Sequence, residues 1–470
     1  MRRKRRRNDR RLCGRTEPSL RTVCPPERKG TSINTICLIS LGCAKNLVDS
    51  EQMLHLIDEA GYQLVSRPEA ADAVVINTCA FIDEAKQEAI NTVLEMDALR
   101  RAGGMPRKII VAGCLAQRYH RQIAESLPEA DAVVGIGSFR GIVGAIRQAL
   151  AGERAELLDP TSLPVMESPR MVSTGPAWAY LRIAEGCSNR CAFCAIPAIR
   201  GPFRSRPMER IVDEARTLAA SGVKELIVIA QDVTRYGEDL YGKRSLAALC
   251  RALCAVDGIE WIRLHYLYPD EFDSELIDTI ASEPKILKYL DIPIQHIDDT
   301  ILRRMNRRGT SAEIRALFAE LRRRIPNLVL RTSLITGLPG EGEAEFEALA
   351  EFLRAERIER AGVFAYSPEE GTPAALMQDR CSEEEAQRRR DLLMQLQQEV
   401  MEQFEAGRIG TVVRVLCTGF DDDGYCVGRS WAESPDIDGV IHFDGPAQPG
   451  EWANVELSAL REGEPFGEQI

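Results

Sequence analysis

Short apolar runs alternate with amphipathic stretches along most of the chain. In the first third, three apolar runs cover residues 35–41, 73–76 and 108–112, and each is followed by helical periodicity. Apolar strands that alternate with amphipathic helices are typical of a parallel sheet covered on both faces. The pattern therefore predicts a doubly wound α/β domain over residues 34–150.

The same alternation returns after a segment rich in proline. Residues 151–175 contain Pro160, Pro164 and Pro169 and are predicted to be a linker. Between residues 176 and 405, six further apolar runs are separated by amphipathic stretches; they cover residues 178–183, 225–230, 259–264, 289–294, 328–335 and 362–366. Six such units predict a partial (β/α)6 barrel, with functional residues in the loops that follow the strands.

The last part of the chain no longer alternates between strands and helices. A charged helical stretch over residues 383–405 is followed by short strand-like runs at 411–417, 425–428, 439–443 and 452–457. Glycine, proline and aspartate interrupt these runs, which is typical of a small antiparallel β-barrel. We therefore expect an α/β multidomain protein whose last domain, residues 408–470, is all-β.

Composition and charge narrow the class of protein. The chain has 470 residues, of which 44% are hydrophobic and 28% charged, and no apolar run has the length of a membrane span. Fourteen cysteines without a secretory signal favour a reducing compartment, the cytoplasm, and no membrane association. Residues 1–30 carry a net charge of +9. We interpret residues 1–33 as a basic disordered extension, with a nucleic-acid-binding arm as the alternative.

Three closely spaced cysteines are the strongest chemical signal. Cys187, Cys191 and Cys194 form a C-x3-C-x2-C motif within the stretch AEGCSNRCAFC. Three thiolates would leave one iron of a 4Fe-4S cluster open, because full ligation takes four. Helical spacing would also place these residues on one buried face, and a zinc site is a further alternative. The flanking Gly186 and Gly201 favour a loop over a helix, and no fourth zinc ligand follows nearby.

A second set of cysteines is spread over the first domain. Cys43, Cys79 and Cys114 each come shortly after one of its three predicted strands. The loops after parallel strands meet at the carboxyl edge of a doubly wound sheet, where ligands bind. A single cysteine there would more often be a packed core thiol. Three at equivalent positions favour a second ligand set.

These motifs resemble the radical S-adenosylmethionine (radical SAM) methylthiotransferases, and the resemblance covers nearly all of residues 34–470. The family combines an amino-terminal domain with three spaced cysteines, a radical SAM barrel and a small β-barrel called TRAM. Several segments look most like its RimO branch: AYLRIAEGC (179–187), IAQD (229–232), DIPIQH (291–296) and DIDG (436–439).

The resemblance implies two 4Fe-4S clusters and the cofactor S-adenosyl-L-methionine. The cluster on Cys187, Cys191 and Cys194 would bind the cofactor and cleave it with an electron from an external donor, a reductant protein. The resulting radical would abstract hydrogen from an unactivated carbon, so no side chain is expected to act as catalytic acid or base. The cluster on Cys43, Cys79 and Cys114 would present sulfur, and a second cofactor molecule would supply the methyl group.

The resemblance also implies a substrate. Members of the RimO branch modify the β-carbon of an aspartate in ribosomal protein S-twelve of the small subunit, whereas the MiaB branch modifies adenosine in tRNA. Residues 408–470 carry a net charge of −8, which suits a basic ribosomal protein better than a nucleic acid. We therefore expect the ribosomal protein as partner, with no stable nucleic-acid binding beyond ribosome association, and MiaB-like activity as the alternative.

Other polar residues at the predicted carboxyl edge of the barrel are weaker candidates. They are possible cofactor or substrate contacts, or hydrogen-bonded interior groups; they are Gln231, His265, Gln295, His296 and Arg331. The remaining cysteines have no comparable context. A non-catalytic zinc or redox module is the alternative from a different functional class.

Overall fold

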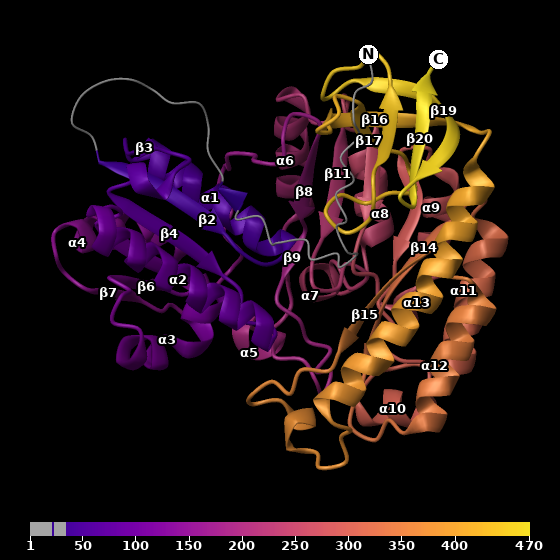
Figure 1. Cartoon of the computed structure of the whole chain (residues 1–470), viewed down its shortest axis with the longest axis horizontal. Helices are drawn as coiled ribbons and strands as arrows, with labels where there is room; N and C mark the ends of the chain where they lie inside the picture. Colours follow the sequence, from indigo (N-terminus) through magenta and orange to yellow (C-terminus); the bar gives the residue numbers. More distant parts are fainter. Residues whose placement is uncertain (1–20, 23–33) are drawn as a thin grey trace, which may run out of the picture.

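The computed structural model describes residues 21–22 and 34–470 of the chain. Apart from Arg21–Thr22, which form the short strand β1, the predicted basic extension lies outside the described residues. Figure 1 shows an α/β domain in purple on the left, a central barrel, and a small β-barrel in yellow near the carboxyl terminus. This confirms the predicted fold class.

The first domain is built on one sheet with helices on both faces. Its strands follow the order β1-β2-β4-β5-β6-β7, with β3 also paired to β2, and all pairs except β1–β2 are parallel. The strands are β2 (Thr35–Ser40), β3 (Gln63–Leu64), β4 (Ala73–Thr78), β5 (Lys108–Gly113), β6 (Ala132–Val134) and β7 (Ala155–Leu157). The last of these begins inside the segment that we expected to be a linker.

Alternate residues of these strands pack against different helices. Ile36, Leu38 and Val75 face α1 (Ala44–Glu59) and α4 (Ile142–Leu150). On the other face, Ile39 and Ile76 join α2 (Asp83–Gly103) and α3 (Cys114–Ser126). Successive side chains of a strand point to opposite faces, which is why these strands are apolar throughout.

The central domain is an open barrel of six parallel strands in the order β15-β14-β13-β12-β11-β8. The strands are β8 (Trp178–Arg182), β11 (Glu225–Ile229), β12 (Trp261–Leu264), β13 (Ile286–Asp291), β14 (Val329–Thr336) and β15 (Arg360–Ala365). The main helices between and after them are α6 (Met208–Ala220), α8 (Leu246–Cys254), α9 (Ser274–Ser282), α11 (Ser311–Arg324), α12 (Glu343–Glu356) and α13 (Glu383–Arg408). Two short helices, α5 (Ile196–Arg200) and α7 (Glu238–Tyr241), lie near β9 (Ala184–Glu185) and β10 (Arg204–Ser205).

One barrel strand lies earlier in the chain than predicted. We expected a strand over residues 289–294, and β13 covers Ile286–Asp291. Pro293 has no backbone N–H and cannot continue a sheet ladder, so the pairing ends before it. Ile292 and Ile294 are buried all the same, and their apolar character extended the predicted strand beyond its true end.

The last domain is a closed five-stranded barrel in the order β16-β17-β18-β20-β19. Its strands are β16 (Val412–Phe420), β17 (Cys426–Arg429), β18 (Ile441–Asp444), β19 (Trp452–Arg461) and β20 (Glu464–Gln469). The expectation of a purely antiparallel barrel is corrected at one seam, because β18 and β20 pair in parallel. The sequence pattern did not predict β20, whose short buried run Pro465–Phe466–Gly467 is flanked by polar residues.

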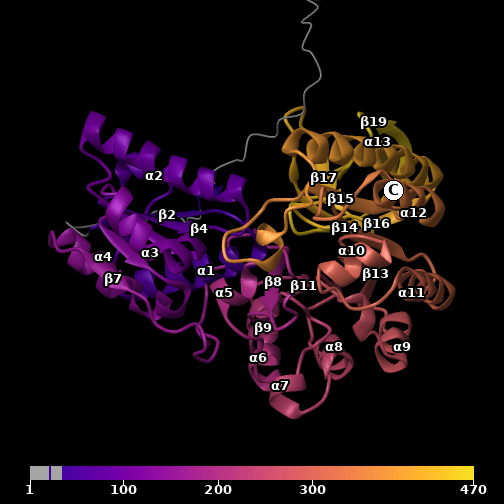
Figure 2. The same ribbon diagram turned by 90° about the horizontal axis from the view of Figure 1, so that it is seen from below.

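The three domains pack closely together. In Figure 2 the first domain lies beside the barrel near β8, β9 and α5. The segment 430–438 of the last domain reaches side chains of the central barrel: Tyr289 Oη donates to Asp438 at 2.6 Å, and Arg263 donates to the Trp431 carbonyl at 2.8 Å. Within the described part of the chain, no helix is long and apolar enough to cross a membrane.

Candidate active site

The three cysteines of the first domain lie at the carboxyl edge of its sheet. Cys43 immediately precedes α1, Cys79 follows β4, and Cys114 is the first residue of α3. The thiols are close enough for the charges of Cys114 and Cys43 to contribute to the raised pKa of Cys79. Cys79 and Cys114 are buried and Cys43 is exposed. The topology thus brings the predicted residues together with one thiol open to its surroundings.

Two glycines allow the loops to approach one another. Gly42 has a φ of +87°, and a Cβ there would lie 2.7 Å from the Cβ of Cys79. Gly113 has a φ of +94°, and a Cβ there would lie 2.3 Å from Oδ1 of Asn77. Side chains would clash at both positions, and positive φ favours glycine. Asn46 joins two of the loops by donating to the carbonyls of Leu41 and Thr78, both at 3.0 Å.

The three cysteines of the radical SAM domain, Cys187, Cys191 and Cys194, lie on an irregular loop between β9 and α5, as the flanking glycines predicted. Cys194 N donates to the Cys191 carbonyl at 3.0 Å, and Cys187 N donates to the Gly201 carbonyl at 3.1 Å. The Cys191 sulfur lies 3.9 Å from Tyr268 Oη and 3.7 Å from a guanidinium nitrogen of Arg307. Backbone bonds therefore shape this loop, and a phenol and a cation from the barrel lie beside one thiol.

Burial raises the pKa of four of the six thiols. It raises the pKa of Cys114 and of Cys187 to about 11, and the pKa values of Cys79 and Cys194 rise further, with nearby thiols adding to the increase. These groups are neutral near pH 7 unless a cation stabilises their thiolates, as bound iron does.

The two sets of thiols suit an iron–sulfur cluster better than a single metal ion. Among the residues that the structure covers, no three Cys, His, Asp or Glu side chains converge tightly enough to hold a single metal ion. A 4Fe-4S cluster makes no such demand, because each thiolate binds a different iron. In each set the thiols are close enough to influence one another's pKa, and three thiolates would fill three of the four ligand positions of a cluster.

A buried arginine joins the first domain to the radical SAM domain beside Cys114. Arg200, at the end of α5, donates to Asn46 Oδ1 at 2.6 Å and to Asp49 Oδ2 at 3.0 Å, both in the first domain. It also donates to Glu185 Oε2 at 2.9 Å and lies 3.7 Å from the Cys114 sulfur. Although burial opposes ionisation, Arg200 and Arg182 hold the pKa of Glu185 at about 2. The sequence analysis did not identify Arg200; its position six residues after Cys194 was the only available signal.

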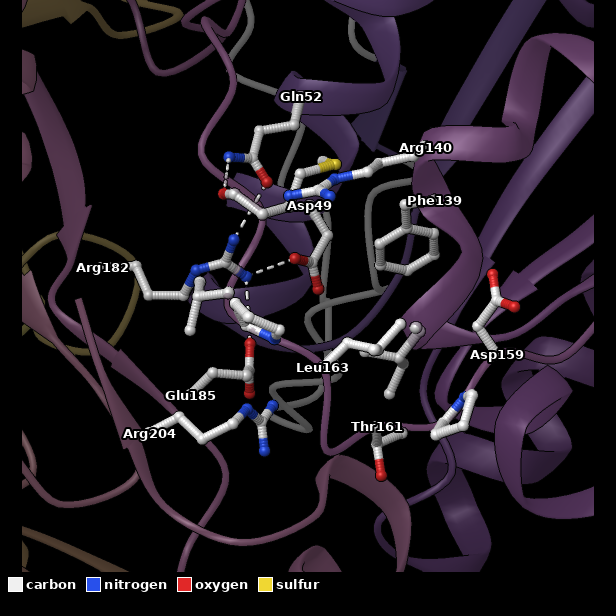
Figure 3. A pocket seen from close by; sticks show the side chains of 16 residues that line it. Asp49, Gln52, Phe139, Arg140, Asp159, Thr161, Leu163, Arg182, Glu185 and Arg204 are labelled. Atoms are coloured by element: carbon white, nitrogen blue, oxygen red, sulfur yellow. Dashed lines mark hydrogen bonds and ion pairs between the residues drawn. The ribbon is translucent and has the colours of Figure 1, made fainter. Parts of the chain in front are cut away.

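Figure 3 shows a cavity of about 280 Å³ next to this charged group. Arg182 lies on one wall and donates to Gln52 Oε1 at 2.9 Å and to Glu185 Oε2 at 3.1 Å. Residues from the segment 159–166 form the opposite wall, and Leu163 points toward the interior. The segment predicted to be a linker is therefore packed between the two domains.

The five weaker candidates have different environments. His265 is buried, its Nε2 lies 2.8 Å from Ser434 Oγ, and burial lowers its pKa to about 3. Gln231 donates to Glu185 Oε1 at 3.1 Å, and Arg331 pairs with Asp291 at 2.8 Å. Nε2 of His296 lies 3.4 Å from Oε2 of Glu341, which is distant from it in sequence.

Gln295 is the fifth of these candidates. Its φ is +72°, and its backbone bonds to β14 through Ser333 and Ile335. Most of the five groups are hydrogen-bonded interior residues, and their contact with a cofactor or substrate stays a prediction.

Three family models match successive parts of the chain. Residues 35–135 match the uncharacterized protein family UPF0004, residues 181–353 match the radical SAM superfamily, and residues 409–470 match the TRAM domain. A protein of Lachnoclostridium phytofermentans named ribosomal protein uS12 methylthiotransferase RimO is 48% identical over 436 residues, covering 92% of this chain and 99% of that protein. The chain belongs to the RimO family of radical SAM methylthiotransferases.

Other similarities agree with this family. A protein of the same name from Acetivibrio thermocellus is 46% identical over 444 residues, covering 92% of this chain and 98% of that protein. Among solved structures, the radical S-adenosylmethionine methyltransferase TsrM from Kitasatospora setae, with cobalamin and a [4Fe-4S] cluster bound, has a TM-score of 0.51. It is 14% identical, and the match covers 73% of this chain and 77% of that one. This last likeness concerns the fold alone.

The curated relatives and the radical SAM family model together show that the chain is a transferase that uses S-adenosylmethionine and a 4Fe-4S cluster.

Proposed function

We propose that this enzyme attaches a methylthio group to the β-carbon of an aspartate in ribosomal protein uS12. Two relatives named ribosomal protein uS12 methylthiotransferase support this substrate. Their sequences are 48% and 46% identical to this chain over almost their whole length. The acidic last domain, with a net charge of −8 over residues 408–470, agrees with a basic protein partner. The proposed reaction belongs to the reducing cytoplasm, where thiols stay free for metals.

The observation that carries the proposal is the pairing of two three-thiol sets at the carboxyl edges of two parallel sheets. We assign Cys187, Cys191 and Cys194 to the cluster that binds S-adenosylmethionine, and Cys43, Cys79 and Cys114 to a second 4Fe-4S cluster. The first set of thiolates would hold the cluster whose electron cleaves the cofactor, and the second set would hold the cluster that presents sulfur. An external reductant protein delivers the electron.

The chain's own residues hold and shield these groups. Tyr268 and Arg307 flank the Cys191 sulfur, and Arg200 neutralises the surroundings of Cys114. No side chain is assigned as general acid or base, because an unactivated carbon offers no acidic proton. The domain division that goes with this proposal is 34–150, together with β7, for the domain of Cys43, Cys79 and Cys114, 176–405 for the radical SAM domain and 408–470 for the TRAM domain.

Anaerobically reconstituted enzyme, incubated with reductant and S-adenosylmethionine, tests the proposal. Purified uS12 and total tRNA are offered separately, and each is examined by mass spectrometry for an added methylthio group. We expect the group on one aspartate of uS12 and on no nucleoside, and enzyme with Cys194→Ala serves as the inactive control. Modification of tRNA adenosine with uS12 unchanged would contradict the proposal and favour the MiaB-like alternative.

A further inference from the structure

Among the described residues, one buried cation forms neither an ion pair nor a hydrogen bond. The structure buries ten lysine and arginine residues within the described ranges. Nine of them form an ion pair or a hydrogen bond: Arg182, Arg200, Arg206, Arg263, Arg307, Arg360, Arg389, Arg408 and Arg429. The tenth is Lys45, whose exposed fraction is 6%. It forms no ion pair and no hydrogen bond with the described residues. A buried charge is costly unless it is paired, so an orphaned one points to a ligand.

Lys45 lies where the two thiol-bearing domains meet. It follows Cys43 by two residues, in the first turn of α1. Its Nζ lies 3.2 Å from the centroid of the Tyr266 ring, which belongs to the loop after β12. The ammonium group therefore projects from the carboxyl edge of the first sheet onto the carboxyl edge of the barrel.

The neighbouring protein groups are already engaged. Asp291 accepts from Arg331 at 2.8 Å and from the Tyr266 backbone N–H at 3.1 Å. His265 is neutral near pH 7, because burial lowers its pKa to about 3, and it bonds to Ser434. The Tyr266 ring face offers Lys45 a cation–π contact, which compensates only part of the cost of burying a charge. The missing partner is thus an anion from outside the described chain.

We propose that Lys45 binds the side-chain carboxylate of the substrate aspartate. This inference rests on the proposed function, since the carbon that gains sulfur must lie between the two thiol sets. In aspartate the β-carbon is bonded directly to the carboxylate, so a cation that fixes the carboxylate also fixes the reacting carbon. The carboxylate of the cofactor is a less suitable occupant, because the loop of Cys191 has its own cation in Arg307, at 3.7 Å from the sulfur.

The test uses the full-length reconstituted enzyme with Lys45→Met, which keeps the length of the side chain and removes its charge. Full-length uS12 is supplied with its target aspartate or with asparagine at that position. We expect Lys45→Met to lower kcat/KM for uS12 by about 100-fold, since removal of one partner of a buried charge pair has effects of this size. Lys45→Arg, which keeps the charge, should retain more activity than Lys45→Met.

Further measurements separate a role in substrate binding from a role at the thiol sites. Binding of uS12 without turnover should weaken in Lys45→Met, while iron content and affinity for S-adenosylmethionine stay at wild-type values. Asparagine-substituted uS12 should bind wild-type enzyme weakly, and Lys45→Met should weaken it no further, because both changes remove the same pair. The matched control is Lys224→Met, since Lys224 also lies over a ring, 6.0 Å from the centroid of Trp452, at the far end of the barrel; it should bind uS12 normally.

Two outcomes would overturn the inference. Normal uS12 binding by Lys45→Met would exclude the carboxylate contact, and a parallel loss of iron or of cofactor affinity would assign Lys45 to the thiol sites instead. A failure of the proposed function is distinguishable from both, because wild-type enzyme itself would then leave uS12 unmodified.

Discussion

At the scale of single residues, one buried arginine links the two domains that carry the thiols. Arg200 belongs to the radical SAM domain, yet it lies 3.7 Å from Cys114 of the first domain. It also pairs with Asp49 and Glu185, which are buried with it. One side chain therefore connects the segment that follows Cys194 to the surroundings of Cys114.

Two triple substitutions test the assignment of the six cysteines. Replacing Cys187, Cys191 and Cys194 by alanine should leave about half the iron of the wild type, on the rule that clusters are held by thiolates, and should abolish cofactor cleavage. Replacing Cys43, Cys79 and Cys114 should also leave about half the iron, while cofactor cleavage persists and sulfur insertion stops. Iron analysis and 5′-deoxyadenosine formation measure both effects. A full iron complement in the second variant would show that the first domain holds no cluster.

Arg200→Met tests the connection between the domains. The substitution leaves two buried carboxylates with one cation, Arg182, and we expect the free energy of unfolding to fall by about 3–5 kcal/mol. Urea denaturation of the full chain, followed by tryptophan fluorescence and circular dichroism, measures the change. Arg204→Met is the matched control, since Arg204 bonds mainly to carbonyl groups and is only half-buried. Equal stability of the two variants would argue against a special role for Arg200.

At the scale of elements, the last barrel is closed by a parallel seam between β18 and β20. His442 on β18 spans this region: its Nδ1 lies 2.7 Å from Asp421 Oδ2, and its Nε2 lies 2.9 Å from Glu464 Oε2 at the start of β20. Partial burial disfavours the charged imidazole, but the two carboxylates outweigh it and raise the pKa of His442. The protonated ring thus holds three segments of the barrel together.

This arrangement predicts a pH dependence of stability. Because the pKa of His442 is higher in the folded chain than its unfolded value of about 6.5, its contribution is fully present below that pH and is lost as the pH rises through the folded value. The wild type should therefore lose stability relative to His442→Gln as the pH rises above about 6.5. Thermal unfolding of both proteins across this range measures the difference. Parallel pH profiles would contradict the prediction.

At the scale of the whole molecule, the last domain is both an acidic surface and a structural part of the barrel. Its segment 430–438 bonds to Arg263 and Tyr289 of the central domain. Glu225, on β11, pairs with Arg263 at 3.0 Å and with Arg429 of the last domain at 2.7 Å. The TRAM domain is therefore anchored by buried polar contacts, while the exposed carboxylates of Asp422 and Asp423 are accessible to a partner.

Charge attraction between this domain and uS12 predicts sensitivity to salt. Since the screening length is about 10 Å at 0.1 M salt, binding should weaken as salt rises. It should weaken further in a variant with Asp422→Asn and Asp423→Asn, two exposed residues; Asp421 is kept because it bonds to His442. Titration of labelled uS12 at several salt concentrations measures both effects. Asp257→Asn, an exposed change in the central domain, is the control, and an equal effect there would exclude a specific acidic surface.

The sequence by itself determined the elements and their chemistry. Apolar runs of strand length, separated by amphipathic helices, predicted both parallel sheets, because a strand covered on both faces must be apolar throughout. The position of Cys43, Cys79 and Cys114 after three strands predicted that they meet, since parallel strands end at one edge. The glycines around Cys187 predicted a loop, because glycine tolerates the positive φ found at Gly186.

Only the tertiary structure decided which elements from distant parts of the chain touch. The parallel pairing of β18 and β20, the packing of segment 430–438 against the barrel, and the contact of Arg200 with Cys114 all join residues more than twenty positions apart. Hydrophobic periodicity reports which face of an element is buried, but not which partner buries it. Lys45 is the clearest case: its sequence context is that of an ordinary helical lysine. Only the packing of two domains around it removes it from water, and the described residues provide no anion for it.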